Sequence, residues 1–133
     1  MESSTGKRGL IDTDILLDAP KGNERSKHLL YQQQTRGAIQ ISVITAMELI
    51  RGCRNAGELR SLLDFMDTFS VLPIGPVASQ KAYQWPVSYS LSHGLQIPDA
   101  LIAGTAVEYG LTLFTGNTCH FRMIPEVIVE QPY

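Results

Sequence analysis

The segment Gly9-Leu-Ile-Asp-Thr-Asp-Ile-Leu-Leu17 sets two acidic residues inside an apolar run. Leu10 and Ile11 open a short strand that we expect to end at Asp12. Burying an isolated carboxylate is costly, so such a group usually takes up a proton, pairs with a cation or binds a metal. We therefore expect Asp12 to belong to a site at the end of the first strand.

Two more acids have apolar surroundings in which a solvated charge would not be expected. Glu48 lies in Ile41-Ser-Val-Ile-Thr-Ala-Met-Glu-Leu-Ile-Arg-Gly52, and Asp99 lies in Ile97-Pro-Asp-Ala-Leu-Ile-Ala103. Together with Asp12 they predict one acidic pocket built from three segments. Hard oxygen ligands of this kind suit Mg²⁺ or Mn²⁺.

Apolar and β-branched stretches alternate with helix-like stretches along the chain. We expect strands at residues 10–12, 38–43, 71–72, 111–114 and 127–129. We expect helices at residues 26–36, 45–52, 57–69, 76–93 and 98–110, with a polar loop at 18–27 and a kink or break at Pro86. Such alternation predicts an α/β fold with a parallel sheet covered on both faces.

In a parallel sheet, the functional crevice lies beyond the carboxyl ends of the strands. Asp12 sits at such an end, and Asn117 follows the strand expected at 111–114. Glu48 and Asp99 are expected in the first turns of their helices, which also border that crevice.

Each candidate has an alternative, purely structural interpretation. Asp12-Thr13-Asp14 fits an Asx turn or helix cap, and Asn117 fits turn chemistry. Thr45-Ala-Met-Glu48 fits a capping box, and Asp99 complements a helix dipole. The structural interpretations of Asp12, Glu48 and Asp99 would all have to be correct at the same time to exclude a shared acidic pocket. This requirement favours the pocket.

The amino-acid composition limits the classes of protein to which this chain can belong. A chain of 133 residues with 44% hydrophobic residues is expected to form one globular domain. The net charge of −2 gives no general indication of nucleic-acid binding. Cys53 and Cys119 lack zinc-site spacing and are expected to be reduced thiols in a cytoplasmic protein. No signal peptide or membrane-spanning segment is expected.

Other polar residues carry less information. We assign neither His93 nor His120 to metal binding or catalysis. The basic residues nearest the candidate acids in sequence could contact phosphates, although a solvated surface explains each of them: Lys7, Arg8, Arg51, Arg54 and Arg122.

With these residues in hand, the chain resembles PIN-domain proteins, specifically the VapC-type toxins of bacterial and archaeal toxin–antitoxin pairs. Four segments in the same order carry the resemblance. They are residues 9–17, 41–52, 94–106 and 110–121, each around an expected acid or its polar partner.

The resemblance implies a three-layer α/β/α sandwich spanning residues 9–133, behind a flexible head at residues 1–8. It implies a Mg²⁺- or Mn²⁺-dependent ribonuclease, a homodimer and a cognate antitoxin, with no membrane association. It also implies that Asp12 and Asp99 bind the metal, and that Thr13 and Asp14 support the pocket. The implied catalytic residues are Asp12, Glu48, Asp99 and Asn117.

Two positions depart from the family pattern. His120 stands where many relatives carry Asp, and Gly116 stands where a basic or polar residue is common. These departures keep open a non-catalytic PIN fold that acts as a binding or scaffold module. A lower-ranked alternative is a DxD-type phosphatase, because Asp12 and Asp14 have that spacing.

Overall fold

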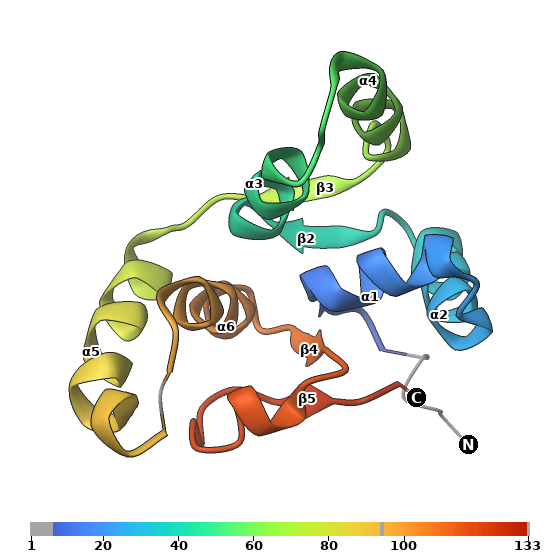
Figure 1. The fold of residues 1–133 in the computed structure, drawn as a ribbon. Coiled ribbons are helices and arrows are strands. Elements are labelled where there is room, and N and C mark those ends of the chain that lie inside the picture. Colours follow the sequence, from blue (N-terminus) through green and yellow to red (C-terminus); the bar gives the residue numbers. More distant parts are fainter. Residues whose placement is uncertain (1–6, 94, 133) are drawn as a thin grey trace.

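The computed structural model describes residues 7–93 and 95–132, with the side chains of residues 90–93 left out. Its centre is a five-stranded sheet in the order β3-β2-β1-β4-β5, and every neighbouring pair is parallel (Figure 1). The strands are β1 (Gly9–Ile11), β2 (Gln40–Ser42), β3 (Ser70–Leu72), β4 (Thr112–Phe114) and β5 (Val129–Glu130). The predicted α/β architecture is therefore confirmed.

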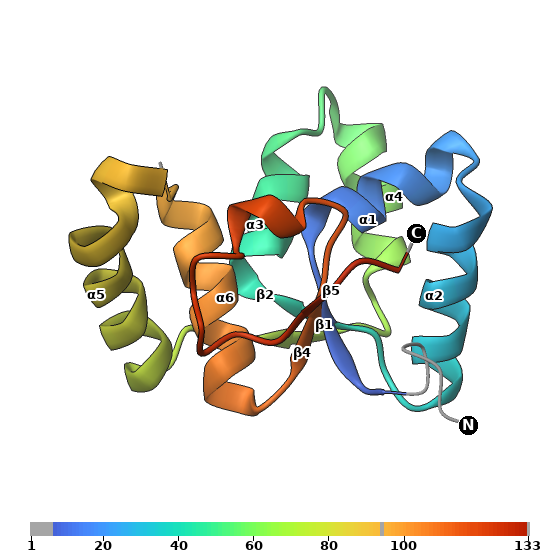
Figure 2. The same ribbon diagram turned by 90° about the horizontal axis from the view of Figure 1, so that it is seen from below.

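Helices cover both faces of this sheet, with α5 and α6 on one side and α1 and α2 on the other (Figures 1 and 2). The α-helices are α1 (Thr13–Asp18), α2 (Glu24–Thr35), α3 (Val43–Arg51), α4 (Ala56–Phe65), α5 (Pro76–His93) and α6 (Ile97–Tyr109). Two short 3₁₀ helices, η2 (Ala19–Lys21) and η3 (Thr118–His120), complete the described elements.

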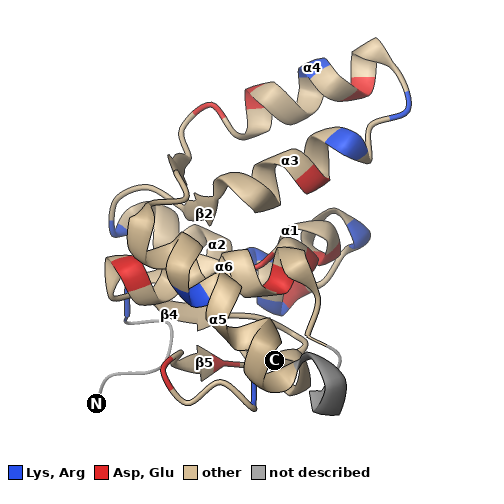
Figure 3. Cartoon of the chain, turned by 90° about the vertical axis from the view of Figure 1, so that its left-hand side faces the viewer, with Lys and Arg blue, Asp and Glu red and all other residues tan. Residues whose placement is uncertain are grey.

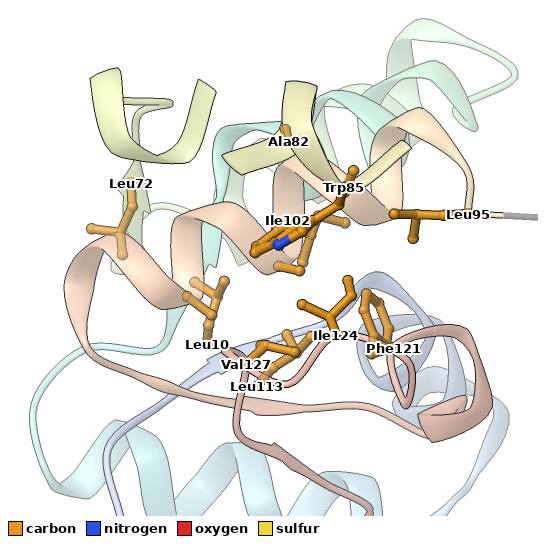
Figure 4. Close-up of a cluster of buried hydrophobic side chains, with 13 residues drawn as sticks. Leu10, Leu72, Ala82, Trp85, Leu95, Ile102, Leu113, Phe121, Ile124 and Val127 are labelled. Carbon is orange, nitrogen blue, oxygen red and sulfur yellow. The ribbon is translucent and has the colours of Figure 1, made fainter. Parts of the chain in front are cut away.

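The two faces of the sheet bury separate apolar clusters. Leu10 and Leu113 pack with Trp85 and Ile102 on the α5–α6 side (Figure 4). Ile11 and its neighbours pack against α1 and α2 on the other side. Successive strand residues point to opposite faces, so each short strand serves both clusters.

The central strands approach each other closely at Gly9. A Cβ atom there would collide with the Phe114 ring and would lie 2.8 Å from the Thr112 carbonyl oxygen. Gly9 therefore lets β1 lie against β4, and this places the ends of both strands at the same edge of the sheet.

Several expected boundaries were wrong. Helix α1 was not predicted. The expected loop at 18–27 contains η2 and the first turn of α2. The N-terminal cap of α2 is Asn23, where Ser26 was expected. Ser26 is instead fully buried. A break at Pro86 is likewise absent, because helix α5 continues through it as one element, while the change of direction of its ribbon in the second half agrees with the alternative expectation of a kink (Figure 2).

Helix α3 also begins earlier than expected. It begins at Val43 because the Ser42 side chain, at the end of β2, accepts a hydrogen bond from the Ile44 amide. The expected start at Thr45 was wrong, and so was the capping-box interpretation of Glu48.

The expected head at residues 1–8 falls mostly outside the described residues. Of its last two residues, Lys7 forms a 2.8 Å ion pair with Glu130, and Arg8 lies 3.4 Å from the Arg36 carbonyl oxygen. Within the described ranges, no helix combines the length and the apolar character that crossing a membrane requires.

Candidate active site

Asp12 lies at the carboxyl edge of the sheet, between β1 and α1. Ile11 pairs with Phe114, so the next residues on the two strands, Asp12 and Thr115, meet beyond the sheet. Thr115 Oγ1 donates a 2.7 Å hydrogen bond to Asp12 Oδ2, and the Thr13 amide donates a 2.8 Å hydrogen bond to Oδ1. The Asp12 carboxylate is therefore fixed in position by groups from both strands.

Burial dominates the electrostatics of Asp12. The residue is 6% exposed. The pKa of its carboxyl group is raised from 3.8 to about 6, mainly by desolvation, although the Thr115 hydrogen bond opposes the shift. The negative charges of Asp14 and Asp99 contribute to the same increase. Asp12 is thus an acid whose ionised form is disfavoured in the metal-free protein.

Asp14 links α1 to the loop after β4. Its Oδ2 accepts a 2.8 Å hydrogen bond from the Gly116 amide and lies 3.4 Å from Asn117 Nδ2. Its Oδ1 is buried and has no hydrogen-bond partner among the described residues. Burial raises the pKa of Asp14 as well. The structure therefore brings Asn117 to the site through Asp14.

Glu48 reaches the same region from α3. Thr13 Oγ1 donates a 2.6 Å hydrogen bond to Glu48 Oε1 and lies 3.1 Å from Thr45 Oγ1. Glu48 itself is exposed and lies in the second turn of α3. The expectation that its charge would be shielded from solvent was wrong, because α3 presents this position to water.

Asp99 enters from the first turn of α6, as expected from Pro98. Its side chain is 22% exposed. Burial raises the pKa of Asp99, the nearby His120 opposes the shift, and the charges of Glu48 and Asp14 add to it. Asp99 therefore interacts electrostatically with acids from both α1 and α3. Figure 3 shows acidic segments on these two neighbouring helices.

The donor set is suited to a hard divalent ion. Within residues 7–93 and 95–132, no three His, Cys, Asp or Glu side chains are arranged to hold an ion together. Even so, Asp12, Asp14 and Asp99 all have raised pKa values, and one buried Asp14 oxygen has no described partner. Carboxylates that destabilise one another and retain free acceptor capacity fit Mg²⁺ or Mn²⁺, which would be held by few protein ligands and several waters.

Two further residues belong to this site that the sequence pattern did not indicate. Thr115 holds Asp12, and Thr45 lies beside the Thr13 hydroxyl that binds Glu48. Thr115 could have been recognised, because it follows β4 directly, as Asp12 follows β1.

An apolar cavity adjoins the acids. It has a volume of about 300 Å³ and lies between α1, α3 and α4. Its lining includes Thr13 and Glu48, which also belong to the acidic site, together with the apolar side chains of Leu16, Leu62 and Phe65.

Known proteins resemble this chain over most of its length. A model of the PIN domain family matches residues 9–125. Ribonuclease VapC10 of Mycobacterium tuberculosis is 33% identical over 119 residues, which cover 89% of this chain and 89% of that protein. Ribonuclease VapC19 of the same organism is 31% identical over 129 residues, which cover 93% of this chain and 98% of that protein. A chain of a toxin–antitoxin complex from Klebsiella pneumoniae has a TM-score of 0.75 and 30% identity, covering 94% of this chain and 98% of that chain.

Proposed function

This chain belongs to the PIN-domain family, and we propose that it is a metal-dependent endoribonuclease and the toxin of a toxin–antitoxin pair. The observation that carries the proposal is the meeting of Asp12, Asp14, Glu48 and Asp99 at one edge of the sheet. Burial raises the pKa of each of the three aspartates, and neighbouring acids of the cluster raise the pKa of Asp12 and Asp99. Perturbed carboxylates gathered in this way are typical of catalytic sites.

In the proposed mechanism, Asp12 and Asp99 would hold the divalent ion. When bound, this ion supplies a water of lowered pKa and neutralises charge that develops on the phosphate. Glu48 orients the attacking water, because its carboxylate is exposed to solvent while the Thr13 hydroxyl holds it in position. Asn117 positions a second water at the rim.

The remaining contacts preserve this arrangement. Thr115 and the Thr13 amide hold the Asp12 carboxylate, and the Gly116 amide holds Asp14. The oxygen of the attacking water loses a proton to solvent and forms a bond to phosphorus, while the bond to the 3′ oxygen breaks and that oxygen takes up a proton from solvent. The products therefore carry 5′-phosphate and 3′-hydroxyl ends.

The charge arrangement favours an enzyme over the scaffold alternative. In a non-catalytic scaffold, neutral residues at these positions would give a more stable fold, because burial disfavours the ionised form of a carboxylate. The presence of buried carboxylates therefore favours a catalytic role. Membership of the PIN-domain family likewise disfavours the DxD phosphatase.

The proposal includes the partners and the compartment. A cognate antitoxin and a homodimer complete the assembly, and RNA is the substrate. The cytoplasm, where such an RNA substrate is found, is the proposed compartment.

Cleavage of a labelled structured RNA pool tests this function. Purified protein free of antitoxin would be incubated with Mg²⁺ or Mn²⁺, beside an EDTA control and the variant Asp99→Asn. The matched control is Asp64→Asn, because Asp64 is an exposed aspartate on α4. We expect metal-dependent cleavage with 5′-phosphate ends that Asp99→Asn abolishes and Asp64→Asn leaves intact. Products with 2′,3′-cyclic phosphates would contradict the mechanism.

A further inference from the structure

His120 lies directly beside Asp99. Its Nδ1 atom is 3.5 Å from Asp99 Oδ2, while 53% of its side chain is exposed. It ends η3, in the same loop that carries Thr115 and Asn117, and its amide donates a 3.0 Å hydrogen bond to the Asn117 carbonyl oxygen. The next residue, Phe121, is buried. The imidazole is therefore anchored at the rim by its backbone and remains accessible from solvent.

The separation of these two atoms is too long for a strong ion pair. A charge-assisted hydrogen bond between nitrogen and a carboxylate oxygen is about 2.7–2.9 Å long. Two ligand atoms on one metal ion lie farther apart. In the octahedral geometry of Mg²⁺ and Mn²⁺, two ligand atoms at a right angle with bonds of about 2.1 Å lie about 3.0 Å apart. The observed separation of 3.5 Å is therefore wider than a strong hydrogen bond, and an ion shared by the two atoms would draw them together by about 0.5 Å.

A nitrogen donor changes the metal preference of an acidic pocket. Mg²⁺ favours oxygen ligands throughout and retains most of its waters. Imidazole binds first-row transition ions well, so its presence raises their affinity relative to that of Mg²⁺. The other donors of this pocket are carboxylate oxygens from Asp12, Asp14, Glu48 and Asp99.

We propose that His120 is a nitrogen ligand of the metal ion held beside Asp99, and that this ligand makes the site prefer Mn²⁺ over Mg²⁺. The inference rests on the proposed function, because it concerns the same metal site. It assigns to His120 a role that neither the sequence pattern nor the family membership assigns.

Pulsed electron paramagnetic resonance of the Mn²⁺-loaded protein tests the ligand directly. Nitrogen bound to Mn²⁺ gives a ¹⁴N coupling that oxygen ligands and water do not give. The variants are His120→Asp, which replaces nitrogen by oxygen, and His120→Ala. The control is His28→Ala, because His28 is an exposed histidine on α2 whose ring contacts Gln32.

We expect the ¹⁴N coupling in the wild type and in His28→Ala, and its loss in both His120 variants. In calorimetry, we expect His120→Ala to weaken Mn²⁺ binding by about tenfold, a typical size for loss of a group supporting a metal site, with little change for Mg²⁺. Circular dichroism would show that the variants remain folded.

Two results would overturn the inference. One is Mn²⁺ binding without ¹⁴N coupling, and the other is a coupling that persists in the His120 variants. If RNA were still cleaved in either case, only the role of His120 would fail. Absence of any Mn²⁺ or Mg²⁺ binding to the wild type would instead overturn both this inference and the proposed function.

Discussion

Thr115 donates a buried hydrogen bond of 2.7 Å from its hydroxyl to Asp12 Oδ2, although the two residues are 103 positions apart in the sequence. The same hydroxyl oxygen accepts a 3.0 Å hydrogen bond from the Asn117 amide. The Asn117 contact thus orients the hydroxyl so that its proton points to Asp12. The loop after β4 therefore holds the carboxylate of Asp12, the residue after β1, in a fixed position.

Thr115→Val should raise the pKa of Asp12 beyond its value of about 6, because the hydrogen bond stabilises the ionised carboxylate. A hydrogen bond to a charged group contributes about 1.5–3 kcal/mol, which corresponds to roughly one to two pH units. Carbon-13 NMR titration of the Asp12 carboxyl group in metal-free protein measures the shift. The control is Thr112→Val, because Thr112 is a buried threonine at the other end of β4. An unchanged Asp12 titration in Thr115→Val would show that the contact contributes nothing.

Asp12→Asn should stabilise the metal-free protein at neutral pH. The folded state raises the pKa of Asp12 from 3.8 to about 6, so it binds this proton more tightly than the unfolded chain does. The contribution of Asp12 to stability is therefore most favourable below about pH 4, falls as pH rises towards about 6, and stays low above that. The free energy of unfolding that Asp12 contributes changes by roughly 3 kcal/mol at most between these pH values, because the pKa is raised by about two units and each unit corresponds to about 1.36 kcal/mol.

Urea denaturation of the wild type and Asp12→Asn measures this effect. We expect a gain in the free energy of unfolding near about pH 7.5 and almost none near about pH 4. Asp64→Asn on the exposed face of α4 serves as the control and should change little at either pH. An equal gain at both pH values would rule out ionisation as the cause. Asp12→Asn should also abolish RNA cleavage.

The sequence pattern could locate Asp12 and Asp99 because both follow local rules. An acid directly after a buried strand and an acid after Pro98 at a helix start are visible in the sequence. The exposure of Glu48 was not visible. It depends on where α3 begins, and Ser42 at the end of a buried strand decides that.

The position of Thr115 after a strand is visible in the sequence, but its hydrogen bond to Asp12 depends on tertiary structure. It requires β1 and β4 to be neighbours with Ile11 opposite Phe114, and this register comes from packing across the whole domain. Helix α1 escaped prediction for a different reason. It is six residues long, too short for a clear helical period, and Asp12 provides its N-terminal cap.

Gln33→Leu should destabilise the fold. Gln33 is 1% exposed, and its side chain accepts a 3.1 Å hydrogen bond from the Gly9 amide and donates a 2.6 Å one to the Lys7 carbonyl oxygen. Leucine would leave a buried amide at the start of β1 without its partner, which costs about 1–3 kcal/mol. Urea denaturation measures the loss, with Gln34→Leu on the exposed face of α2 as the control. Equal effects of the two substitutions would show that the contact does not support β1.

Arg51→Ala should weaken RNA binding without affecting the acids. Arg51 is exposed in the last turn of α3, lines the same surface hollow as Glu48, and forms no ion pair with a described residue. Arg54, by contrast, is bound to Glu58 at 2.8 Å. Arg51 therefore has no competing carboxylate among the described residues and lies where it could contact a phosphate next to the scissile one.

Binding would be measured in an Asp99→Asn background, so that the RNA is not cleaved. Each phosphate contact adds about one to the slope of the logarithm of the RNA-binding constant against the logarithm of the salt concentration. Arg51→Ala should therefore reduce the magnitude of that slope by about one. The control is Arg25→Ala, because Arg25 is an exposed arginine in the first turn of α2. An identical reduction in both variants would mean that the protein's overall charge attracts the RNA. A reduction confined to Arg51→Ala would place the path of the RNA backbone along the C-terminal end of α3, past Glu48.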